Sequence, residues 1–409
     1  MLKIEFRSER KSREDILIQL PSSKSISNRL SIINALSEQP LPIIAWSEAD
    51  DALTMQSLLK SREDELDVGM AGTAMRFLTA YHSLQKGREV VLKGDQRMHE
   101  RPIGPLVAAL RQLGAEISYL DKEGYPPLKI KGQPLDGSSI AIDASYSSQY
   151  VTALLLIAPY LKNGLEMKLQ RPTSQPYIQM TTSLMQKCGI ILHRKDDRID
   201  VEKGTYQLDS AYQVEADWSS AAFFYQFFAL SKLEEIKLNQ LQDKSIQGDR
   251  KCVEYFQKLG VATSFHKDHI QLSKTAVVTE FIDVDMTDHP DLILPFVFAA
   301  VFLCKSVHIH GIQTLRLKES DRVKTLLTEL QKLAEINYQV DERDLRIRLI
   351  KKKSVIPALQ THGDHRVAMS VAATIPIFNT LKLDDEKVVN KSFPNFWKEL
   401  SKMGVVLKP

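Results

Sequence analysis

Basic residues recur beside the expected starts of helices along the 409-residue chain. Segments 20–29 (LPSSKSISNR), 71–76 (AGTAMR) and 363–366 (GDHR) combine Ser, Thr, Asp or Gly with Lys or Arg. A helix N-terminus offers free N–H groups and about half a positive charge, and arginine pairs bidentately with carboxylate or phosphate. We therefore expect a site for a small, multiply negative ligand, with basic candidates Lys24, Arg29, Arg76, Arg97, Arg101, Lys318, Arg322, Arg366 and Lys391.

Two carboxylates are candidates for acid–base chemistry at such a site: Asp291, which follows Pro290, and Glu319 in LKESDR. A carboxylate among cations can move a proton if desolvation offsets their pull on its pKa. Spacing alone favours plainer roles, with Asp291 as a helix cap and Glu319 in an ion pair with Arg322.

Nucleotide and metal motifs are missing from the sequence. It has no GxxxxGK[ST] loop, no GxGxxG after a strand and no kinase set, so a nucleotide held in a standard way is not expected. His362, Asp364 and His365 lie at a helix start without the i,i+4 spacing of a zinc helix. His308 and His310 alternate on an expected strand, which favours a structural role. We predict no metal.

Composition narrows the class of protein. Lys and Arg number 54 against 51 Asp and Glu, a net charge of +3, which gives no basis for a nucleic-acid partner. The longest apolar run, residues 292–304, is shorter than the ~18 residues of a spanning helix. The three cysteines, Cys188, Cys252 and Cys304, show no CxxC spacing, and no apolar leader is visible. A cytoplasmic protein without membrane or nucleic-acid partners is expected.

Two interleaved series of helical segments must position these residues. Amphipathic segments start at residues 102, 176, 248, 320 and 393, in steps of 74, 72, 72 and 73, and a shorter relative spans 47–60. Most end in a Gly that suits a left-handed C-terminal position. A second series is apolar nearly all round, which predicts burial, and starts at residues 27, 72, 147, 219, 291 and 365. The period predicts six similar units, grouped three and three with a seam near residues 210–216.

The motifs together resemble the EPSP synthase (3-phosphoshikimate 1-carboxyvinyltransferase) family. The resemblance covers nearly the whole chain in the family's order, in the segments LPSSKSISNR, AGTAMRFL, GDQRMHERPIGPL, SSQYVTALL, SQPYIQMT, QGD (247–249), LKESDR, GDHRVAMS and KSFPNFW. It implies an α/β (α+β) protein with the two-domain enolpyruvyl transferase fold, an inside-out α/β barrel of six βαβαββ repeats, three per domain. The N-terminal domain would span 21–214 and the C-terminal domain 1–20 with 215–409, joined by hinge crossings near 20 and 215 and closing over substrates.

The resemblance also implies the reaction. The enolpyruvyl group of phosphoenolpyruvate passes to the 5-hydroxyl of shikimate 3-phosphate through a tetrahedral intermediate, in the shikimate pathway, with no metal or organic cofactor and in a monomer. Asp291 would accept the hydroxyl proton, Glu319 would donate to the methylene carbon, and Lys24 would share the proton transfers. By motif, shikimate 3-phosphate would be held by Lys24, Ser25, Arg29, Ser147, Ser148, Gln149, Ser174, Tyr177, Asp291 and Lys318. Phosphoenolpyruvate would be held by Lys24, Gly72, Arg97, Gln149, Arg322, Arg366 and Lys391.

Four positions depart from the family pattern. Ser22 stands for a Gly, Met70 for an Asn, Phe77 for a Pro, and Thr314 aligns with an Asn whose contact is not carried over. Gly72 is kept, and we expect glyphosate to compete with phosphoenolpyruvate. Two alternatives stay open: a UDP-N-acetylglucosamine enolpyruvyl transferase, whose family carries a reactive loop cysteine, and an anion-binding protein without catalysis.

Overall fold

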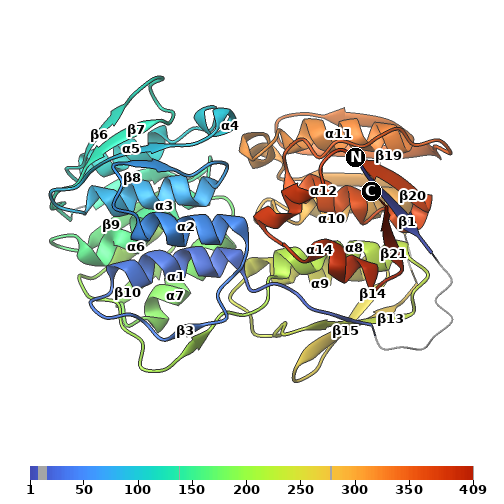
Figure 1. Ribbon diagram of the computed structural model, residues 1–409, viewed down its shortest axis with the longest axis horizontal. Coiled ribbons are helices and arrows are strands. Elements are labelled where there is room, and N and C mark those ends of the chain that lie inside the picture. Colours follow the sequence, from blue (N-terminus) through green and yellow to red (C-terminus); the bar gives the residue numbers. More distant parts are fainter. Residues whose placement is uncertain (8–15, 138, 277–278, 409) are drawn as a thin grey trace. The chain divides into compact units, whose positions relative to one another are not determined.

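The computed structural model describes residues 1–7, 16–137, 139–276 and 279–408, and the chain divides into two compact units (Figure 1). Unit 1 consists of Met1–Ser23 and Glu215–Pro409, and unit 2 of Lys24–Val214. The chain therefore passes twice from one unit to the other. Residues 8–15, within the N-terminal segment assigned by sequence to the second domain, lie outside the described residues.

Three mutually contacting helices form the centre of unit 2: α1 (Lys24–Leu36), α3 (Gly72–Ser83) and α6 (Ser148–Ile157). Eight of the ten residues of α6 are buried, from Tyr150 to Ile157, because the helix is apolar on all sides. Amphipathic helices pack on this centre, namely α2 (Asp50–Lys60), α5 (Gly104–Gln112) and α7 (Gln175–Lys187). Two short helical segments complete the unit, α4 (Gln96–His99) and η1 (Ala158–Tyr160).

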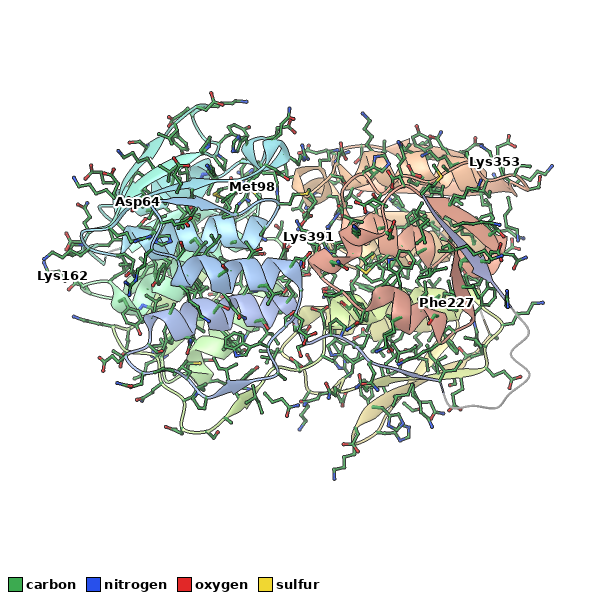
Figure 2. All side chains as sticks on the ribbon, viewed as in Figure 1. Asp64, Met98, Lys162, Phe227, Lys353 and Lys391 are labelled. Atoms are coloured by element: carbon green, nitrogen blue, oxygen red, sulfur yellow. The ribbon has the colours of Figure 1, made fainter. Side chains whose placement is uncertain are left out.

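Unit 1 repeats this arrangement around α8 (Trp218–Leu230), α10 (Ile293–Cys304) and α12 (His365–Ala372), which also contact one another. All thirteen residues of α8 are buried. Its aromatic side chains build the core; Phe227 is labelled in Figure 2. The rings of Phe227 and Phe6 meet edge-on, with their centroids 5.6 Å apart. The remaining helical segments are η2 (Gly248–Lys251), α9 (Cys252–Gln257), η3 (Gln313–Leu317), α11 (Arg322–Leu333), α13 (Ile375–Phe378), η4 (Lys387–Lys391) and α14 (Phe396–Ser401).

Four four-stranded sheets share one topology, in which a parallel pair is extended by two antiparallel strands. In unit 2 the first has the order β4 (Glu65–Asp67), β5 (Glu89–Lys93), β7 (Leu128–Lys131), β6 (Glu116–Tyr119). The second has the order β8 (Ser139–Asp143), β9 (Leu165–Gln170), β11 (Arg198–Val201), β10 (Leu192–Lys195).

The two corresponding sheets of unit 1 follow the same order of pairing. One runs β2 (Leu17–Ile18), β13 (Glu235–Asn239), β15 (His269–Lys274), β14 (Val261–Phe265). The other runs β16 (Phe281–Asp285), β17 (Ser306–His310), β19 (Asp344–Lys352), β18 (Ala334–Val340).

Two further sheets are reduced forms of the same pattern. Strand β1 (Leu2–Phe6) pairs antiparallel with β20 (Thr380–Leu383) and β21 (Val405–Lys408), and an isolated parallel bridge from Leu359 to Leu383 stands where a fourth strand would lie. In unit 2, β3 (Ile43–Ile44) and β12 (Tyr212–Gln213) form a two-stranded parallel sheet. The chain is therefore of the α/β class, with buried helices covered by small mixed sheets.

The helical expectations are confirmed for both series, because a helix occurs at every expected segment. The expected left-handed glycines also occur, with positive φ at Gly114, Gly189, Gly260 and Gly404. The fourth amphipathic segment ends differently. Helix α11 stops at Leu333 and β18 starts at Ala334, since alanine lacks the conformational freedom of glycine to turn the chain.

Within the described residues, no helix is both long enough and apolar enough to cross a membrane.

Candidate active site

The helix starts of unit 1 converge through their side chains. Asp291 lies just before α10, Arg322 opens α11, and Arg366 is the second residue of α12. Hydrogen bonds join Arg322 and Arg366 to Asp291, so the N-terminal ends of three helices share one site. The sequence had indicated these residues separately, Arg322 and Arg366 as anion-binding candidates and Asp291 as an acid–base candidate.

Arg322 is the centre of this half of the site, with 1% of its surface exposed. Its Nε donates to Oδ2 of Asp364 at 2.8 Å, its Nη1 to Oδ1 of Asp291 at 3.1 Å, and its Nη2 to Oε2 of Glu319 at 2.9 Å. Burial opposes the charged guanidinium, but the three carboxylates outweigh it and raise the pKa of Arg322. One fixed cation thus holds three carboxylates at known positions.

Asp291 does not cap a helix, which corrects the reading favoured by spacing. Helix α10 begins two residues later, at Ile293, and has no side-chain cap. The Asp291 carboxylate instead accepts from Arg322 and from Nη2 of Arg366 at 2.9 Å. Burial pushes its pKa up, but Arg366, Lys318 and Arg322 outweigh burial and hold the pKa well below the usual range. Asp291 is therefore an ionised, partly buried carboxylate.

Glu319 forms the ion pair expected from spacing, with Arg322 three residues ahead. Its second oxygen, Oε1, lies 3.9 Å from Nζ of Lys391, the residue labelled in Figure 2 at the end of η4. The Asp291 and Glu319 carboxylates accept from the two terminal nitrogens of the same guanidinium. The geometry thus brings together Asp291, Glu319, Lys318, Arg322, Arg366 and Lys391, all singled out by sequence.

A second buried aspartate lies beside this group. Asp249, in the QGD segment, is 2% exposed and accepts a hydrogen bond from Oγ of Ser219 in α8. Burial, and then the negative charge of Asp291, raise the pKa of Asp249 to about 7. Two nearby carboxyl groups therefore have their pKa values pushed in opposite directions, a pattern typical of catalytic sites.

The helix starts of unit 2 gather in the same way. Gln149, the second residue of α6, donates from Nε2 to Oγ1 of Thr73 at the start of α3, at 3.2 Å. Lys24, the first residue of α1, pairs with Asp51 at the start of α2, with Nζ 3.0 Å from Oδ2. The N-terminal ends of α1, α2, α3 and α6 therefore lie at one end of the helical centre.

Arg29 is a buried cation held by neutral groups. It donates to Oγ1 of Thr181 at 2.9 Å, to the carbonyl of Ser25 at 2.8 Å and to the carbonyl of Tyr177 at 3.1 Å. Its guanidinium lies 5.8 Å from the ring centre of Phe77, the residue that departs from the family pattern. Burial lowers the pKa of Arg29 to about 10, and no carboxylate in the described part of the chain pairs with it. Such a site suits an anionic ligand.

Arg101 presses against Gly72. A Cβ added to Gly72 would lie 2.5 Å from both Nη atoms of Arg101, and the Nε of Arg101 is buried without a hydrogen-bond partner among the described residues. Arg97, the arginine assigned to phosphoenolpyruvate by motif, is one-third exposed and pairs with Glu100 at 2.8 Å. Arg101 thus meets the start of α3 directly, whereas Arg97 holds a surface ion pair.

The remaining assigned residues of unit 2 lie at helix starts. Ser147 caps α6 by accepting from the backbone N–H of Gln149 at 3.2 Å, and Ser148 is the first residue of that helix. Ser174 precedes α7 in a left-handed conformation with φ of 54°. Tyr177 follows in the first turn of α7, where its backbone contacts Arg29.

Several contributors were not assigned a site role from sequence. Thr152 and Thr181 hold Arg29, Asp51 holds Lys24, and Asp364 both caps α12 and pairs with Arg322. The GDHR segment carried a signal for Asp364, since Asp at a helix start is typical of an N-cap. The threonines carried none, because only the tertiary fold brings them to Arg29.

The cysteine that would matter for a UDP-N-acetylglucosamine enolpyruvyl transferase is inert. Cys188 is fully buried at the end of α7, and burial raises its pKa to about 12. A thiol with such a pKa supplies almost no thiolate at neutral pH, so this chain lacks that feature at Cys188.

Comparison with known proteins identifies the family. The EPSP synthase (3-phosphoshikimate 1-carboxyvinyltransferase) family model matches residues 56–400. The 3-phosphoshikimate 1-carboxyvinyltransferase of Bacteroides fragilis (strain ATCC 25285) is 41% identical over 96% of each chain, and that of Mannheimia haemolytica is 34% identical over 96% of this chain and 98% of its own. The fold is similar to that of an EPSP synthase structure from Acinetobacter baumannii, with a TM-score of 0.77, 21% identity and full coverage of both chains. The chain therefore belongs to the EPSP synthase (3-phosphoshikimate 1-carboxyvinyltransferase) family.

Proposed function

We propose that Asp291, Glu319 and Lys24 carry the proton transfers of this enzyme's reaction. The enzyme transfers the enolpyruvyl group of phosphoenolpyruvate to shikimate 3-phosphate in the shikimate pathway, and releases phosphate. The observation that carries the proposal is the pair of carboxylates, Asp291 and Glu319, held at 3.1 and 2.9 Å by one buried guanidinium, that of Arg322.

In the proposed addition step, the 5-hydroxyl oxygen of shikimate 3-phosphate bonds to C2 of phosphoenolpyruvate. Asp291, which its low pKa keeps ionised, takes the hydroxyl proton, and protonated Glu319 gives a proton to the methylene carbon. The negative charges of the two substrates favour the protonated form of Glu319. In the elimination, Glu319 takes a proton back from that carbon as the C–O bond to phosphate breaks, with Lys24 assisting the leaving phosphate.

For shikimate 3-phosphate we propose a binding set centred on Arg29. Burial without a paired carboxylate makes this guanidinium a ready partner for an anion, because a ligand anion would offset its desolvation. The full proposed set is Lys24, Ser25, Arg29, Ser147, Ser148, Gln149, Ser174, Tyr177, Asp291 and Lys318.

For phosphoenolpyruvate we propose Lys24, Gly72, Arg97, Gln149, Arg322, Arg366 and Lys391, and we add Arg101. The contact of Arg101 with Gly72 and its unpartnered Nε support this addition among the described residues. Arg97 and Arg101 lie in the same short segment, so each serves as the control for the other.

The finer architecture is part of the same proposal. We propose six βαβαββ repeats in an inside-out barrel arrangement, three per domain, with hinge crossings near residues 20 and 215. The shared topology of four sheets and the reduced forms of the other two support it. We further propose a cytoplasmic monomer that needs neither metal nor organic cofactor for this reaction.

The test is phosphate release with both substrates, each omitted in turn, for the wild type and for Lys24→Met, Asp291→Asn and Glu319→Gln. We expect release only with both substrates present, and a fall in turnover of about 10²–10⁴ in each variant. Binding of both ligands with near-normal turnover in a variant would remove that residue from its role. Binding without any turnover in the wild type would favour an anion-binding protein.

A further inference from the structure

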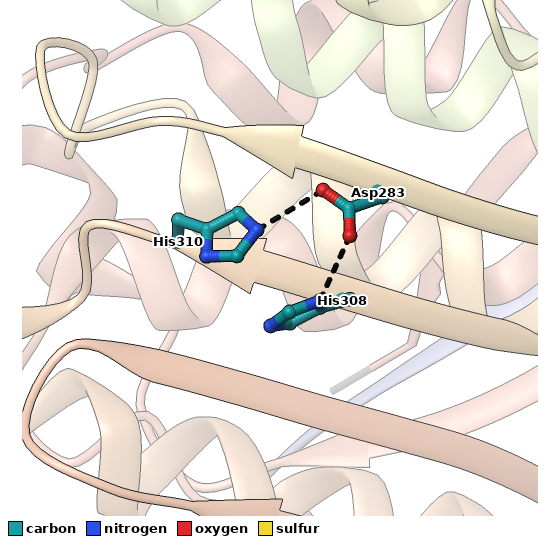
Figure 3. Close-up of side chains that lie close together, drawn as sticks. All are labelled: Asp283, His308 and His310. Atoms are coloured by element: carbon teal, nitrogen blue, oxygen red, sulfur yellow. Dashed lines mark hydrogen bonds and ion pairs between the residues drawn. The ribbon is translucent and has the colours of Figure 1, made fainter.

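A second cluster of titratable side chains lies on the outer face of the sheet β16–β17–β19–β18 (Figure 3). Asp283 comes from β16, His308 and His310 from β17, and Asp344 from β19. The alternating residues of these strands point into the core, including Ile282, Val284, Val307, Ile309 and Leu345. The cluster therefore faces away from the core and has no part in the chemistry proposed above.

Asp283 joins the two histidines. Its Oδ2 lies 2.9 Å from Nδ1 of His308, and its Oδ1 lies 3.0 Å from Nε2 of His310. The two imidazole rings are 4.0 Å apart, and one ligand atom from each of the three residues lies within 4.8 Å of the others. Among the described residues, it is the one group of three or more His, Cys, Asp or Glu side chains whose ligand atoms lie this close together.

We propose that Asp283, His308 and His310 bind a divalent transition-metal ion, with Zn²⁺ as the reference ion. Two imidazole nitrogens and one carboxylate oxygen are donors that zinc accepts, whereas Mg²⁺ and Ca²⁺ prefer oxygen ligands alone. Bonds of about 2.0–2.1 Å in a tetrahedron separate ligand atoms by roughly 3.4 Å. The observed separations of 2.9 and 3.0 Å run to the two different oxygens of Asp283, and one ligand atom from each residue lies within 4.8 Å of the others, so the Asp283 carboxylate must turn to place one oxygen beside both nitrogens.

The surroundings of His310 support the assignment. Its other ring nitrogen, Nδ1, lies 3.0 Å from Oδ1 of Asp344. A carboxylate that accepts from the far nitrogen of a histidine fixes the tautomer with a lone pair on the metal side, and such partners recur at zinc sites. Asp344 is therefore a positioning residue for His310.

Arg346 opposes the binding of a metal ion at this cluster. Its Nε donates to Nε2 of His308 at 3.3 Å, which favours the tautomer with a proton on Nδ1, the nitrogen that would bind the ion. Its positive charge also repels a cation. Arg346 is exposed, so its side chain is able to move away when an ion binds.

Ordinary cross-strand hydrogen bonding is the simpler account of the same contacts. That account leaves two imidazoles 4.0 Å apart beside one carboxylate, where they would repel each other if both were protonated. A single ion in place of the two shared protons removes that repulsion. It would also tie β16 to β17, the strands that lead to Asp291 and Lys318.

The full chain, stripped of metal by a chelator, is titrated with Zn²⁺ against a competing chromophoric chelator, and with Co²⁺ followed by visible absorption. We expect one equivalent of Zn²⁺ to bind at micromolar concentration or below and to raise Tm. His308→Ala, His310→Ala and Asp283→Asn should each weaken binding at least tenfold, and Asp344→Asn about 10–100-fold. Arg346→Gln should tighten binding.

The matched control is the double variant His266→Ala/His269→Ala. These two rings stack at 4.7 Å at the hairpin of β14 and β15, but they belong to no cluster of this kind among the described residues. Zinc affinity should be unchanged in this double variant, and circular dichroism of each metal-free variant reports folding separately. Binding weaker than about millimolar, or equal affinity in wild type and His308→Ala/His310→Ala, would overturn the proposal.

Discussion

Nη2 of Arg366 donates to Oδ2 of Asp291 at 2.9 Å, although 75 residues separate the two in the chain. Both lie at the starts of buried helices, and Arg322 binds the second carboxylate oxygen of Asp291 at 3.1 Å. Asp291 is thus a partly buried anion between two buried arginines. Its predicted catalytic role and its part in stability are linked by this contact.

We predict that Asp291→Asn lowers turnover by about 10²–10⁴ while the fold is retained, because the amide cannot accept the hydroxyl proton. Loss of the negative charge leaves Arg322 and Arg366 less compensated, so Tm should also fall. Steady-state phosphate release and thermal denaturation measure the two effects. Asp200→Asn, an exposed residue of β11, is the control and should keep normal turnover and Tm.

We predict that Arg366→Ala raises the KM for phosphoenolpyruvate by about tenfold or more, with a smaller effect on shikimate 3-phosphate. Loss of a charged hydrogen bond to a ligand typically costs about 1.5–3 kcal/mol. Initial rates with each substrate varied in turn provide the measurement. An unchanged KM for phosphoenolpyruvate would contradict the assignment.

Arg97 and Arg101 lie in the short segment after β5. We predict that Arg101→Ala weakens the binding of phosphoenolpyruvate more than Arg97→Ala does. Arg101 is buried against Gly72, whereas Arg97 is bound to Glu100 at the surface. Gly72→Ala should act through the same contact by displacing Arg101, and should raise the KM for phosphoenolpyruvate. Inhibition by glyphosate, which we expect to be competitive with phosphoenolpyruvate, should weaken in parallel. A larger effect at Arg97 would reverse the order of importance.

Arg29→Met should raise the KM for shikimate 3-phosphate by about 10–100-fold with little loss of stability. The substitution removes a buried cation that no described carboxylate compensates, and methionine keeps much of the side-chain volume. Urea unfolding of the free enzyme and substrate kinetics measure the two properties. A large loss of stability without a change in KM would make Arg29 a structural residue.

The stability of the enzyme should depend on pH through Asp249. Its folded-state pKa of about 7 lies above the ordinary value near 3.9, so the folded chain holds an extra proton between these pH values. The contribution is full below pH ~3.9 and is lost as pH rises to about 7, which lowers the free energy of unfolding by the order of a few kcal/mol. Asp249→Asn should flatten this decline. Parallel Tm–pH curves for variant and wild type would contradict it.

The helices were predictable from sequence because local periodicity specifies them. The apolar segment at 219 became α8, buried on every side, and the amphipathic segment at 320 became α11. Helix boundaries were harder to predict where a side chain with the features of a cap makes a tertiary contact instead. Asp291 has the sequence signature of a cap, yet two distant arginines bind it, and the local pattern carries no trace of them.

Site residues were predictable where they sit in motifs and not where packing brings them in. The motifs named Arg29 and Arg322. Thr152, Thr181 and Phe77 lie inside the same motif segments, but nothing in the motifs indicated that packing brings them to Arg29. Arg97 lies in the short helix α4 and Arg101 two residues after its end, and only Arg101 is buried. Sequence spacing alone does not separate the two.

The neutral surroundings of Arg29 have a practical consequence. A guanidinium desolvated without a counter-charge makes the ligand-free chain less stable than its contacts alone would suggest. Any small anion that reaches it, including the phosphate released by the reaction, acts as the missing counter-ion and adds its binding energy to stability. We therefore expect the buffer anion to change the measured Tm. A melting curve recorded in phosphate would describe a partly liganded enzyme.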